Sequence, residues 1–150
     1  MYPESVRSQM LISPMTVVKA PEHPQQWYDD TILDRRRFIR YIEGLAGGSL
    51  DTFVLNRMRE PLTQPGSRET FMRMFRAMRR PPEHDIGFCP TIAIWGGADP
   101  LLGGAAMEAT KQYIKEAECH VLKTAGHFPT ETHYKALSDY LRGWIRYVEE

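Results

Sequence analysis

The chain has 150 residues, 42% of them hydrophobic, and its 19 basic side chains balance its 19 acidic ones. This length is enough for one domain with a buried core. Because the net charge is zero, the composition provides no basic surface for a nucleic acid or an anionic membrane, and we expect neither as a partner.

The cysteines and the apolar runs indicate where in the cell the protein is expected. The apolar runs are short and interrupted, and the sequence shows no signal peptide. Cys89 and Cys119 match no metal-binding spacing and no disulfide framework. Both flank predicted strands, where small buried thiols are common. We therefore expect a cytoplasmic protein.

Residues 1–15 predict one core strand. A short polar turn leads into an apolar run from Met10 to Ser13, which Pro14 ends. The following stretch, residues 16–27, contains two prolines and is expected to form an irregular connection.

Residues 16–86 predict a helical block. Apolar residues recur at helical spacing in three segments that are bounded by glycine or proline. These residues are Ile32, Phe38, Ile39, Ile42 and Leu45 in the first segment, Leu50, Phe53, Val54 and Met58 in the second, and Phe71, Met74, Phe75 and Met78 in the third. Ser49 and Ser67 are the expected N-caps of the second and third helices. Core packing is the favoured role of this block, and a lid over a substrate is the alternative.

Residues 87–150 predict a strand–helix–strand–helix unit. The uncharged run 91–95 favours a strand that is buried on both faces. A helix is expected over residues 104–116 and a second strand over residues 119–123. The last helix has the clearest apolar stripe, formed by Tyr134, Leu137, Leu141, Trp144, Ile145 and Val148. This order of elements is typical of a parallel sheet, so the predicted fold class is α/β.

One titratable residue follows each strand of this unit. Asp99 lies in the turn after the first strand, and His127 follows Gly126 after the second. In parallel sheets, ligands and chemistry collect beyond the carboxyl ends of the strands. A carboxylate there binds one imidazole nitrogen and leaves the other to act as a base. The spacing alone is consistent with a catalytic pair and with two ordinary turn residues.

Two segments resemble the last third of an α/β-hydrolase-fold enzyme. The segment 90-PTIAIWGGADPLL-102 resembles the family's penultimate strand and the turn with its acid, and 125-AGHFPTETHYKALSDYLRGWI-145 resembles the turn with its histidine and the last helix. Residues 2–15 are similar to the end of the helix after the nucleophile and the next strand. Residues 16–86 lie where the family inserts its cap. The resemblance implies a partial α/β-hydrolase fold of about three parallel strands with flanking helices and an inserted helical cap.

The same resemblance implies a function. His127 would be the general base and Asp99 its orienting acid in the hydrolysis of an ester or related bond of a small-molecule substrate, without a cofactor. Some members of the family place the acid after an earlier strand. Here no Asp or Glu occurs between Pro14 and Glu22, which favours Asp99.

The nucleophile of this family lies on a G-x-S-x-G elbow that precedes the acid and the histidine. The sequence lacks this motif. Its nearest match, 47-GGSLD-51, lacks the second glycine and follows a predicted helix, and Ser67 fails the same test of context. Cys89 and Cys119 lie at the wrong end of their strands. We therefore expect the elbow and the oxyanion hole upstream of Met1. The nucleophile can be Ser, Asp or Cys. The possible activities are therefore those of an esterase, an epoxide hydrolase, a dehalogenase and a carbon–carbon bond hydrolase.

Without its upstream neighbour, the first strand would have an open edge, which is a site of association. We expect the chain to be inactive alone and to self-associate, to be marginally stable or to bind an N-terminal complementing chain. The alternative function is that of a non-catalytic truncated paralogue, or of a split-enzyme half, that acts through this exposed edge.

The remaining candidates are aromatic and potential metal-binding residues. An apolar substrate pocket would use Phe128, Trp27, Phe71 and Phe75, with Phe128 foremost because it adjoins His127. Glu131 and His133 lie two positions apart on a predicted helix and cannot share a face, so we expect no metal site with His127. His120, within a predicted strand, is expected to be structural.

Overall fold

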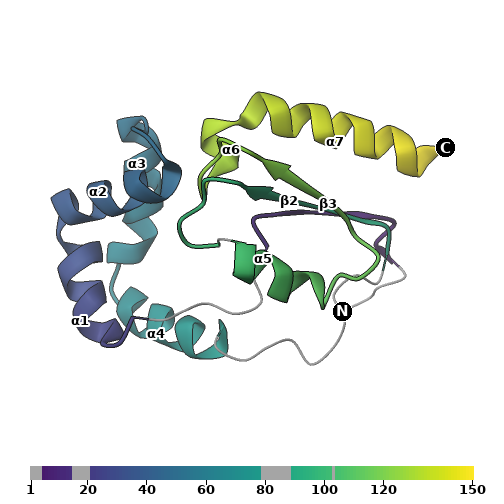
Figure 1. Cartoon of the computed structure of the whole chain (residues 1–150). Coiled ribbons are helices and arrows are strands. Elements are labelled where there is room, and N and C mark those ends of the chain that lie inside the picture. Colours follow the sequence, from purple (N-terminus) through teal and green to yellow (C-terminus); the bar gives the residue numbers. More distant parts are fainter. Residues whose placement is uncertain (1–4, 15–20, 79–88, 103) are drawn as a thin grey trace.

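A computed structural model of the chain describes residues 5–14, 21–78, 89–102 and 104–150 (Figure 1). Its centre is a sheet of three parallel strands in the order β1 (Gln9–Ile12), β2 (Thr91–Gly96) and β3 (Glu118–Leu122). In the register, Gln9 lies opposite Thr91, and Ile92 lies opposite Glu118. Every residue of β2 is buried, as the uncharged run predicts. The predicted parallel α/β architecture is confirmed.

Helices cover both faces of this sheet (Figure 1). Helix α7 (Tyr134–Glu149) packs on one face, where Ile92 and Ile94 of β2 form a core with Leu137 and Trp144. Helix α5 (Gly104–Lys111) lies on the other face. There Ala93 and Trp95 of β2 pack with Leu102 and Ile114. Alternate residues of β2 therefore serve two separate cores, as the period-two geometry of a strand requires.

The helices between β1 and β2 form a second body beside the carboxyl ends of the strands (Figure 1). They are α1 (Pro24–Tyr28), the π-helical turn η2 (Asp29–Leu33), α2 (Arg35–Ala46), α3 (Thr52–Arg59), the 3₁₀ turn η3 (Glu60–Thr63) and α4 (Ser67–Met78). We call residues 21–78 the helical block. Its core contains Tyr28, Ile32, Phe38, Ile42, Leu55 and Met72. The predicted boundaries of this block, near residues 15 and 86, lie outside the described residues.

Local signals set the ends of α2. The Asp34 side chain accepts a hydrogen bond of 2.9 Å from the backbone N–H of Arg37, which caps the helix and lowers the pKa of the Asp34 carboxyl. At the other end, Gly47 has a φ of 77°, a left-handed conformation that glycine adopts without strain. The predicted closure of this helix at Gly47 is confirmed.

Both predicted serine caps are wrong. Asp51, and not Ser49, caps α3, because its carboxylate accepts a hydrogen bond of 2.7 Å from the N–H of Phe53. Ser67 is itself the first residue of α4, and its hydroxyl donates to the carbonyl oxygen of Pro61. A short polar side chain near a helix start was visible in the sequence at each place, but the residue that makes the bond was not.

Three further expectations need correction. Helix α5 ends at Lys111 and not near residue 116, and turns carry the chain onward to the buried Ile114. Cys119 is exposed instead of buried, because it lies on an edge strand. Only Leu137 and Trp144 of the predicted α7 stripe are buried, since three strands do not cover the whole stripe. Its exposed members are Tyr134, Leu141 and Ile145.

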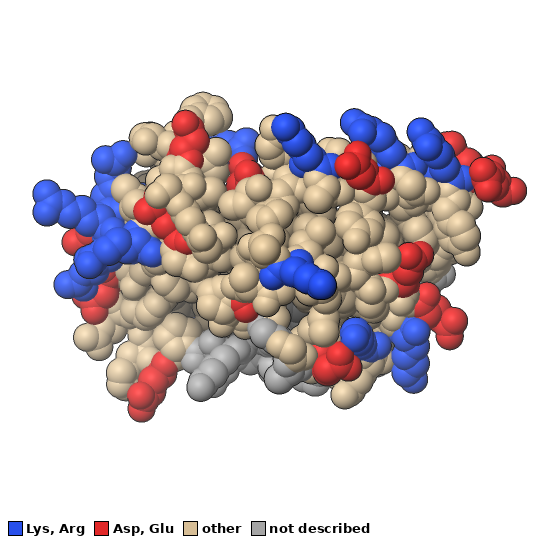
Figure 2. Space-filling view, turned by 45° about the horizontal axis from the view of Figure 1, so that its top comes forward, with Lys and Arg blue, Asp and Glu red and all other residues tan. Residues whose placement is uncertain are grey.

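The surface has no single-sign character on the face seen in Figure 2, where Lys and Arg side chains alternate with Asp and Glu side chains. Among the described residues, no helix has both the length and the hydropathy that a membrane span requires.

Candidate active site

The three strands run parallel, so the residues that follow them meet at one edge of the sheet. Ser13 comes directly after β1, Asp99 lies in the turn after β2, and His127 lies in the loop after β3. This edge faces the helical block (Figure 1). The arrangement brings Asp99 and His127, the two residues singled out in the sequence, into direct contact.

Asp99 is a buried carboxylate whose two oxygens have different partners. Oδ1 accepts hydrogen bonds from the backbone N–H groups of Leu101, at 2.8 Å, and Leu102, at 3.0 Å. Oδ2 lies 2.8 Å from Nδ1 of His127. The Asp99 side chain has no exposed surface. Two backbone donors and one imidazole thus fix both the position and the orientation of the carboxylate.

His127 is held through its backbone as well as its ring. Its N–H donates to the carbonyl oxygen of Leu45 at 2.8 Å, and its own carbonyl oxygen accepts from the Ser13 hydroxyl at 3.3 Å. Because Asp99 faces Nδ1, the proton of a neutral imidazole belongs on that nitrogen. Nε2 forms no hydrogen bond with any described residue, and it is therefore left with a lone pair.

Two glycines allow this loop to approach its neighbours closely. A Cβ atom at Gly96 would overlap the backbone of Ala125 and Gly126, and one at Gly126 would overlap the carbonyl oxygens of Leu45 and Ala46. Neither position has room for a side chain. The last turn of α2 therefore lies directly on the loop that carries His127, and the helical block and the histidine are in backbone contact.

Ser13 and Leu45 are the two contributors to this geometry that sequence reasoning missed. Ser13 has a φ of 46°, which is uncommon for a residue other than glycine, and its N–H donates to Ile94 at 2.8 Å. A Ser-Pro pair directly after a strand was a local signal for a special turn. Leu45 acts through its carbonyl oxygen, for which no sequence signal exists.

The aromatic candidates fall in two places: Phe128 lies next to His127, and Trp27, Phe71 and Phe75 lie within the helical block. Phe128 contacts the His127 ring edge-on, with ring centroids 4.9 Å apart, and packs against the core of the helical block. Trp27 and Phe71 stack at 5.9 Å, and Phe75 lies 4.7 Å from Phe71. All four are partly buried. The three aromatic residues of the helical block form one cluster, and Phe128 packs against the same core.

Tyr41 is a further aromatic residue of this cluster, and its hydroxyl is titratable. Tyr41 meets Trp27 edge-on at 5.2 Å, and burial raises the pKa of its hydroxyl. A tyrosine hydroxyl is protonated at neutral pH even at its ordinary pKa of about 10, and the raised pKa leaves it so. It adds no charge to the apolar cluster.

The other titratable candidates have partners of their own. Glu131 pairs with Arg57 at 3.0 Å, and the ring of His133 bonds to the hydroxyls of Thr124 and Thr132. No group of three or more His, Cys, Asp or Glu side chains is arranged to hold a metal ion within the described ranges. Ser49 is exposed in the loop between α2 and α3.

The sequence matches no family model and no curated protein sequence. The structure, in contrast, is similar to solved enzymes. A serine hydrolase from Cycloclasticus zankles superposes with a TM-score of 0.72 at 14% identity, over 97% of this chain and 57% of that one. A meta-cleavage product hydrolase from Pseudomonas fluorescens gives a TM-score of 0.69 at 19% identity, again over 97% of this chain and 57% of that one.

A haloalkane dehalogenase variant from Bradyrhizobium elkanii gives a TM-score of 0.65 at 16% identity, over 96% of this chain and 60% of the enzyme. The chain thus spans little more than half the length of the structures it matches. At these identities the likeness establishes the fold and not the activity. The chain has a partial α/β-hydrolase fold, with three parallel strands and flanking helices.

Proposed function

From this partial α/β-hydrolase fold we propose that the chain supplies the acid and the base of a hydrolase active site. His127 is the general base, Asp99 orients it, and the nucleophile comes from polypeptide outside these 150 residues. The observation that carries the proposal is the 2.8 Å contact between His127 Nδ1 and the buried Asp99 Oδ2, with Nε2 unpaired among the described residues.

The proposed roles imply an order of proton transfers. Nε2 takes the proton of the nucleophile as it attacks the substrate carbonyl carbon, and Asp99 stabilises the imidazolium that forms. The imidazolium then returns that proton to the leaving alcohol, and the bond between the carbonyl carbon and the alcohol oxygen breaks. In the second half-reaction Nε2 takes a proton from water as the water oxygen attacks the acyl carbon. The bond between that carbon and the nucleophile then breaks, and the imidazolium returns the proton to the nucleophile, which frees the acid and restores the neutral base.

The edge of β1 supports a nucleophile from further polypeptide. β1 pairs only with β2 among the described strands, and the outer edge of such a strand is where a further strand can add to the sheet. Beside it, β1 and α7 form a shallow groove of about 160 Å³ that contains the exposed side chains Ile12, Tyr134 and Leu141. A further strand with a helix would bury both the edge and this apolar surface.

The same edge favours the alternative function, a non-catalytic interaction module. The two functions differ in what His127 does. In the module the His127–Asp99 bond only holds the loop, and no reaction depends on it. In the hydrolase every turnover passes through Nε2.

The substrate is proposed to be a small molecule with an apolar acyl or alkyl part. Phe128 lies against the imidazole, and Trp27, Phe71 and Phe75 extend the aromatic surface into the helical block. Aromatic rings bury hydrocarbon without any polar requirement. The proposal is therefore limited to an ester or a related bond next to an apolar group.

The test starts from the native protein of the source cells, captured with an antibody to α7. Its intact mass is compared with the 17.3 kDa of this chain. Its rate of ester hydrolysis is measured on p-nitrophenyl butyrate. We expect a larger mass, or a bound second chain, and ester hydrolysis. His127→Ala in the complete protein should lower kcat at least about a thousandfold.

The matched control is His23→Ala, because His23 is exposed and its side chain makes no capping bond at α1. It should leave kcat unchanged. Full activity of the folded His127→Ala protein would overturn the proposal in favour of the interaction module. If the 17.3 kDa chain alone hydrolyses the ester and His127→Ala abolishes that activity, the nucleophile lies within the chain. That result would overturn the proposal of an external nucleophile and keep the role of His127.

A further inference from the structure

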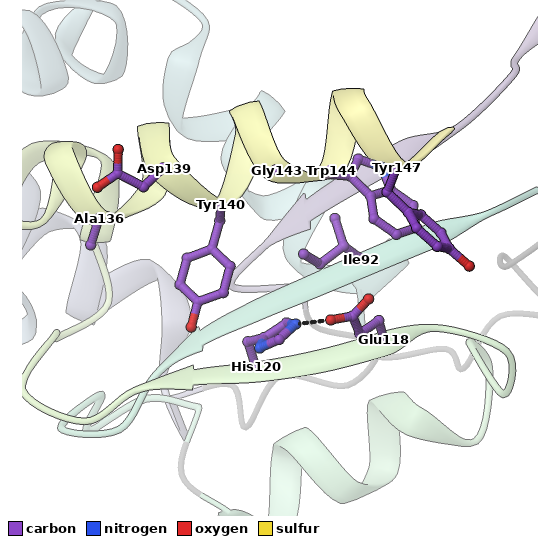
Figure 3. A pocket seen from close by; sticks show the side chains of 9 residues that line it. All are labelled: Ile92, Glu118, His120, Ala136, Asp139, Tyr140, Gly143, Trp144 and Tyr147. Carbon is purple, nitrogen blue, oxygen red and sulfur yellow. Dashed lines mark hydrogen bonds and ion pairs between the residues drawn. The ribbon is translucent and has the colours of Figure 1, made fainter. Parts of the chain in front are cut away.

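A second hollow lies on the other side of the sheet from α5, and the proposed hydrolase function does not use it. It is a groove of about 550 Å³ between α7 and the strands β2 and β3 (Figure 3). Its floor comes from Ile92, Glu118 and His120, and its roof comes from Ala136, Asp139, Tyr140, Gly143, Trp144 and Tyr147.

The groove exists because α7 presents small residues to it. Gly143 lies between Tyr140 and Trp144 in the roof, and a Cβ atom there would meet nothing within 4 Å. Ala136 adds only a methyl group. The small size of these two residues therefore leaves the space open, and we expect a larger side chain at residue 143 to occupy it.

Aromatic rings form the walls. The Tyr140 ring descends from α7 toward β3 and lies 4.7 Å from the His120 ring (Figure 3). Farther along the helix, Trp144 and Tyr147 stack with their ring centroids 5.4 Å apart. Three aromatic side chains from one helix thus surround the space above Ile92 and Glu118. Such rings bind hydrocarbon and attract cations.

The charge of the lining has one sign. Glu118 and Asp139 are acidic, and no Lys or Arg is among the lining residues. Asp139 is engaged by Arg142 at 3.1 Å on the outer surface. Glu118 uses Oε1 to bind His120 Nε2 at 2.5 Å, and its Oε2 has no partner among the described residues. Glu118 therefore keeps one free carboxylate oxygen at the floor of the groove.

We propose that this groove binds an organic ammonium ion. The hydrocarbon part of the ligand lies against Tyr140, Trp144 and Ile92, and its nitrogen lies at Oε2 of Glu118. The aromatic faces and the carboxylate both favour a positive charge, and no fixed cation opposes it. The site is independent of Asp99 and His127, so its failure would leave the proposed hydrolase function untouched.

The first experiment titrates 2-phenylethylammonium into the ¹⁵N-labelled chain. The reporters are the backbone amides of β3 and α7 and the indole N–H of Trp144, whose signal is assigned by its loss in Trp144→Phe. We expect saturable shifts confined to these groups, with a Kd on the order of 1 mM. Shifts spread over the helical block, or no saturation, would overturn the proposal.

The second experiment tests the charge. The neutral 2-phenylethanol and the anionic 3-phenylpropionate have a similar hydrocarbon part, and both should bind at least about fivefold more weakly than the ammonium ion. Glu118→Gln should weaken the binding of the ammonium ion by about fivefold and leave the affinity for 2-phenylethanol unchanged. Equal affinities for all three compounds would mean a merely apolar groove and would overturn the assignment.

The third experiment fills the groove. Gly143→Leu should abolish the shifts, while Gly44→Leu serves as the matched control on α2, where a Cβ atom also meets nothing within 4 Å. The control should bind 2-phenylethylammonium with unchanged Kd. Unchanged binding by a folded Gly143→Leu chain would place the ligand elsewhere and overturn the proposal.

Discussion

The chain contains two histidine–carboxylate pairs that are alike in distance and opposite in surroundings. His127 and Asp99 lie 2.8 Å apart, and His120 and Glu118 lie 2.5 Å apart. The side chains of the first pair are 13% and 0% exposed, and those of the second are 28% and 56% exposed. The first spans two loops, whereas the second joins residues two apart on one edge strand.

The difference shows what makes a pair suitable for chemistry. Asp99 has two backbone donors besides the imidazole, and the backbone of His127 is bound at both its N–H and its carbonyl oxygen. Glu118 has no donor other than His120 among the described residues. A short distance alone is therefore a poor criterion, and the number of fixed partners around the pair is a better one.

The largest expected effect comes from the glycine that supports the buried pair. In Gly126→Ala the new methyl group overlaps the carbonyl oxygens of Leu45 and Ala46, so α2 and the His127 loop must separate. We expect the free energy of unfolding to fall by about 3 kcal/mol. Urea unfolding at low protein concentration, followed by tryptophan fluorescence, measures it.

Gly44→Ala is the control for that substitution, because Gly44 lies on exposed helix surface with open space around it. It should stabilise the chain by about 0.5 to 1 kcal/mol through helix propensity. A similar gain for Gly126→Ala would contradict the close contact between α2 and the loop.

The next effect concerns the carboxylate itself. Asp99→Ala leaves the buried N–H groups of Leu101 and Leu102 and the His127 ring without their acceptor, and should cost about 2 kcal/mol. Asp99→Asn keeps an oxygen for the two backbone donors. Its amide must donate to Nδ1, which moves the imidazole proton to Nε2 and leaves that nitrogen without a free lone pair.

The measurement is the ¹⁵N spectrum of the His127 ring, which distinguishes the two tautomers. We expect Asp99→Asn to remain folded with the tautomer reversed. An Asp99→Asn chain whose ring spectrum equals that of the parent would mean that Asp99 does not set the proton position.

The buried pair could be predicted from the sequence, and its supports could not. Asp99 follows an uncharged, β-branched run, His127 follows a second short strand, and a glycine precedes each within two residues. Parallel topology brings such positions together whatever the details of packing. The contact between Gly126 and Leu45 depends on how the helical block sits on the sheet. That packing is a tertiary result, since a backbone carbonyl has no signature in the sequence.

The exposed pair of His120 and Glu118 could not be predicted from the sequence, for a different reason. The sequence predicts a strand position for His120, and His120 does lie in β3. Its pairing with Glu118 and its contact with Tyr140 require that β3 is an edge strand beneath α7. Similarly, the exposed half of the α7 stripe follows from the number of strands beneath it, which periodicity does not report.

A smaller effect is expected where β1 meets the His127 loop. Ser13→Ala removes the hydroxyl that donates to the His127 carbonyl oxygen and should cost about 1 kcal/mol. Ser13→Gly removes the same hydroxyl but suits the positive φ of this position, so its cost should be smaller. Urea unfolding of the two variants measures the difference, and a greater loss in the glycine variant would contradict this account.

We expect the smallest effect at the exposed pair. A double-mutant cycle measures the coupling energy within each pair and so compares the two pairs directly. Glu118→Gln and His120→Ala change a partly solvated pair, so their coupling energy should be within about 0.5 kcal/mol of zero. The equivalent cycle with Asp99→Ala and His127→Ala should give a larger value, about 1 kcal/mol, because both side chains are enclosed and each residue is held by backbone hydrogen bonds of its own. Urea unfolding of seven chains, the parent and three variants for each pair, supplies both cycles. Equal coupling energies would mean that burial and backbone donors do not strengthen the Asp99–His127 pair relative to the Glu118–His120 pair. They would then give no energetic support to the proposal that His127 is a preorganised base.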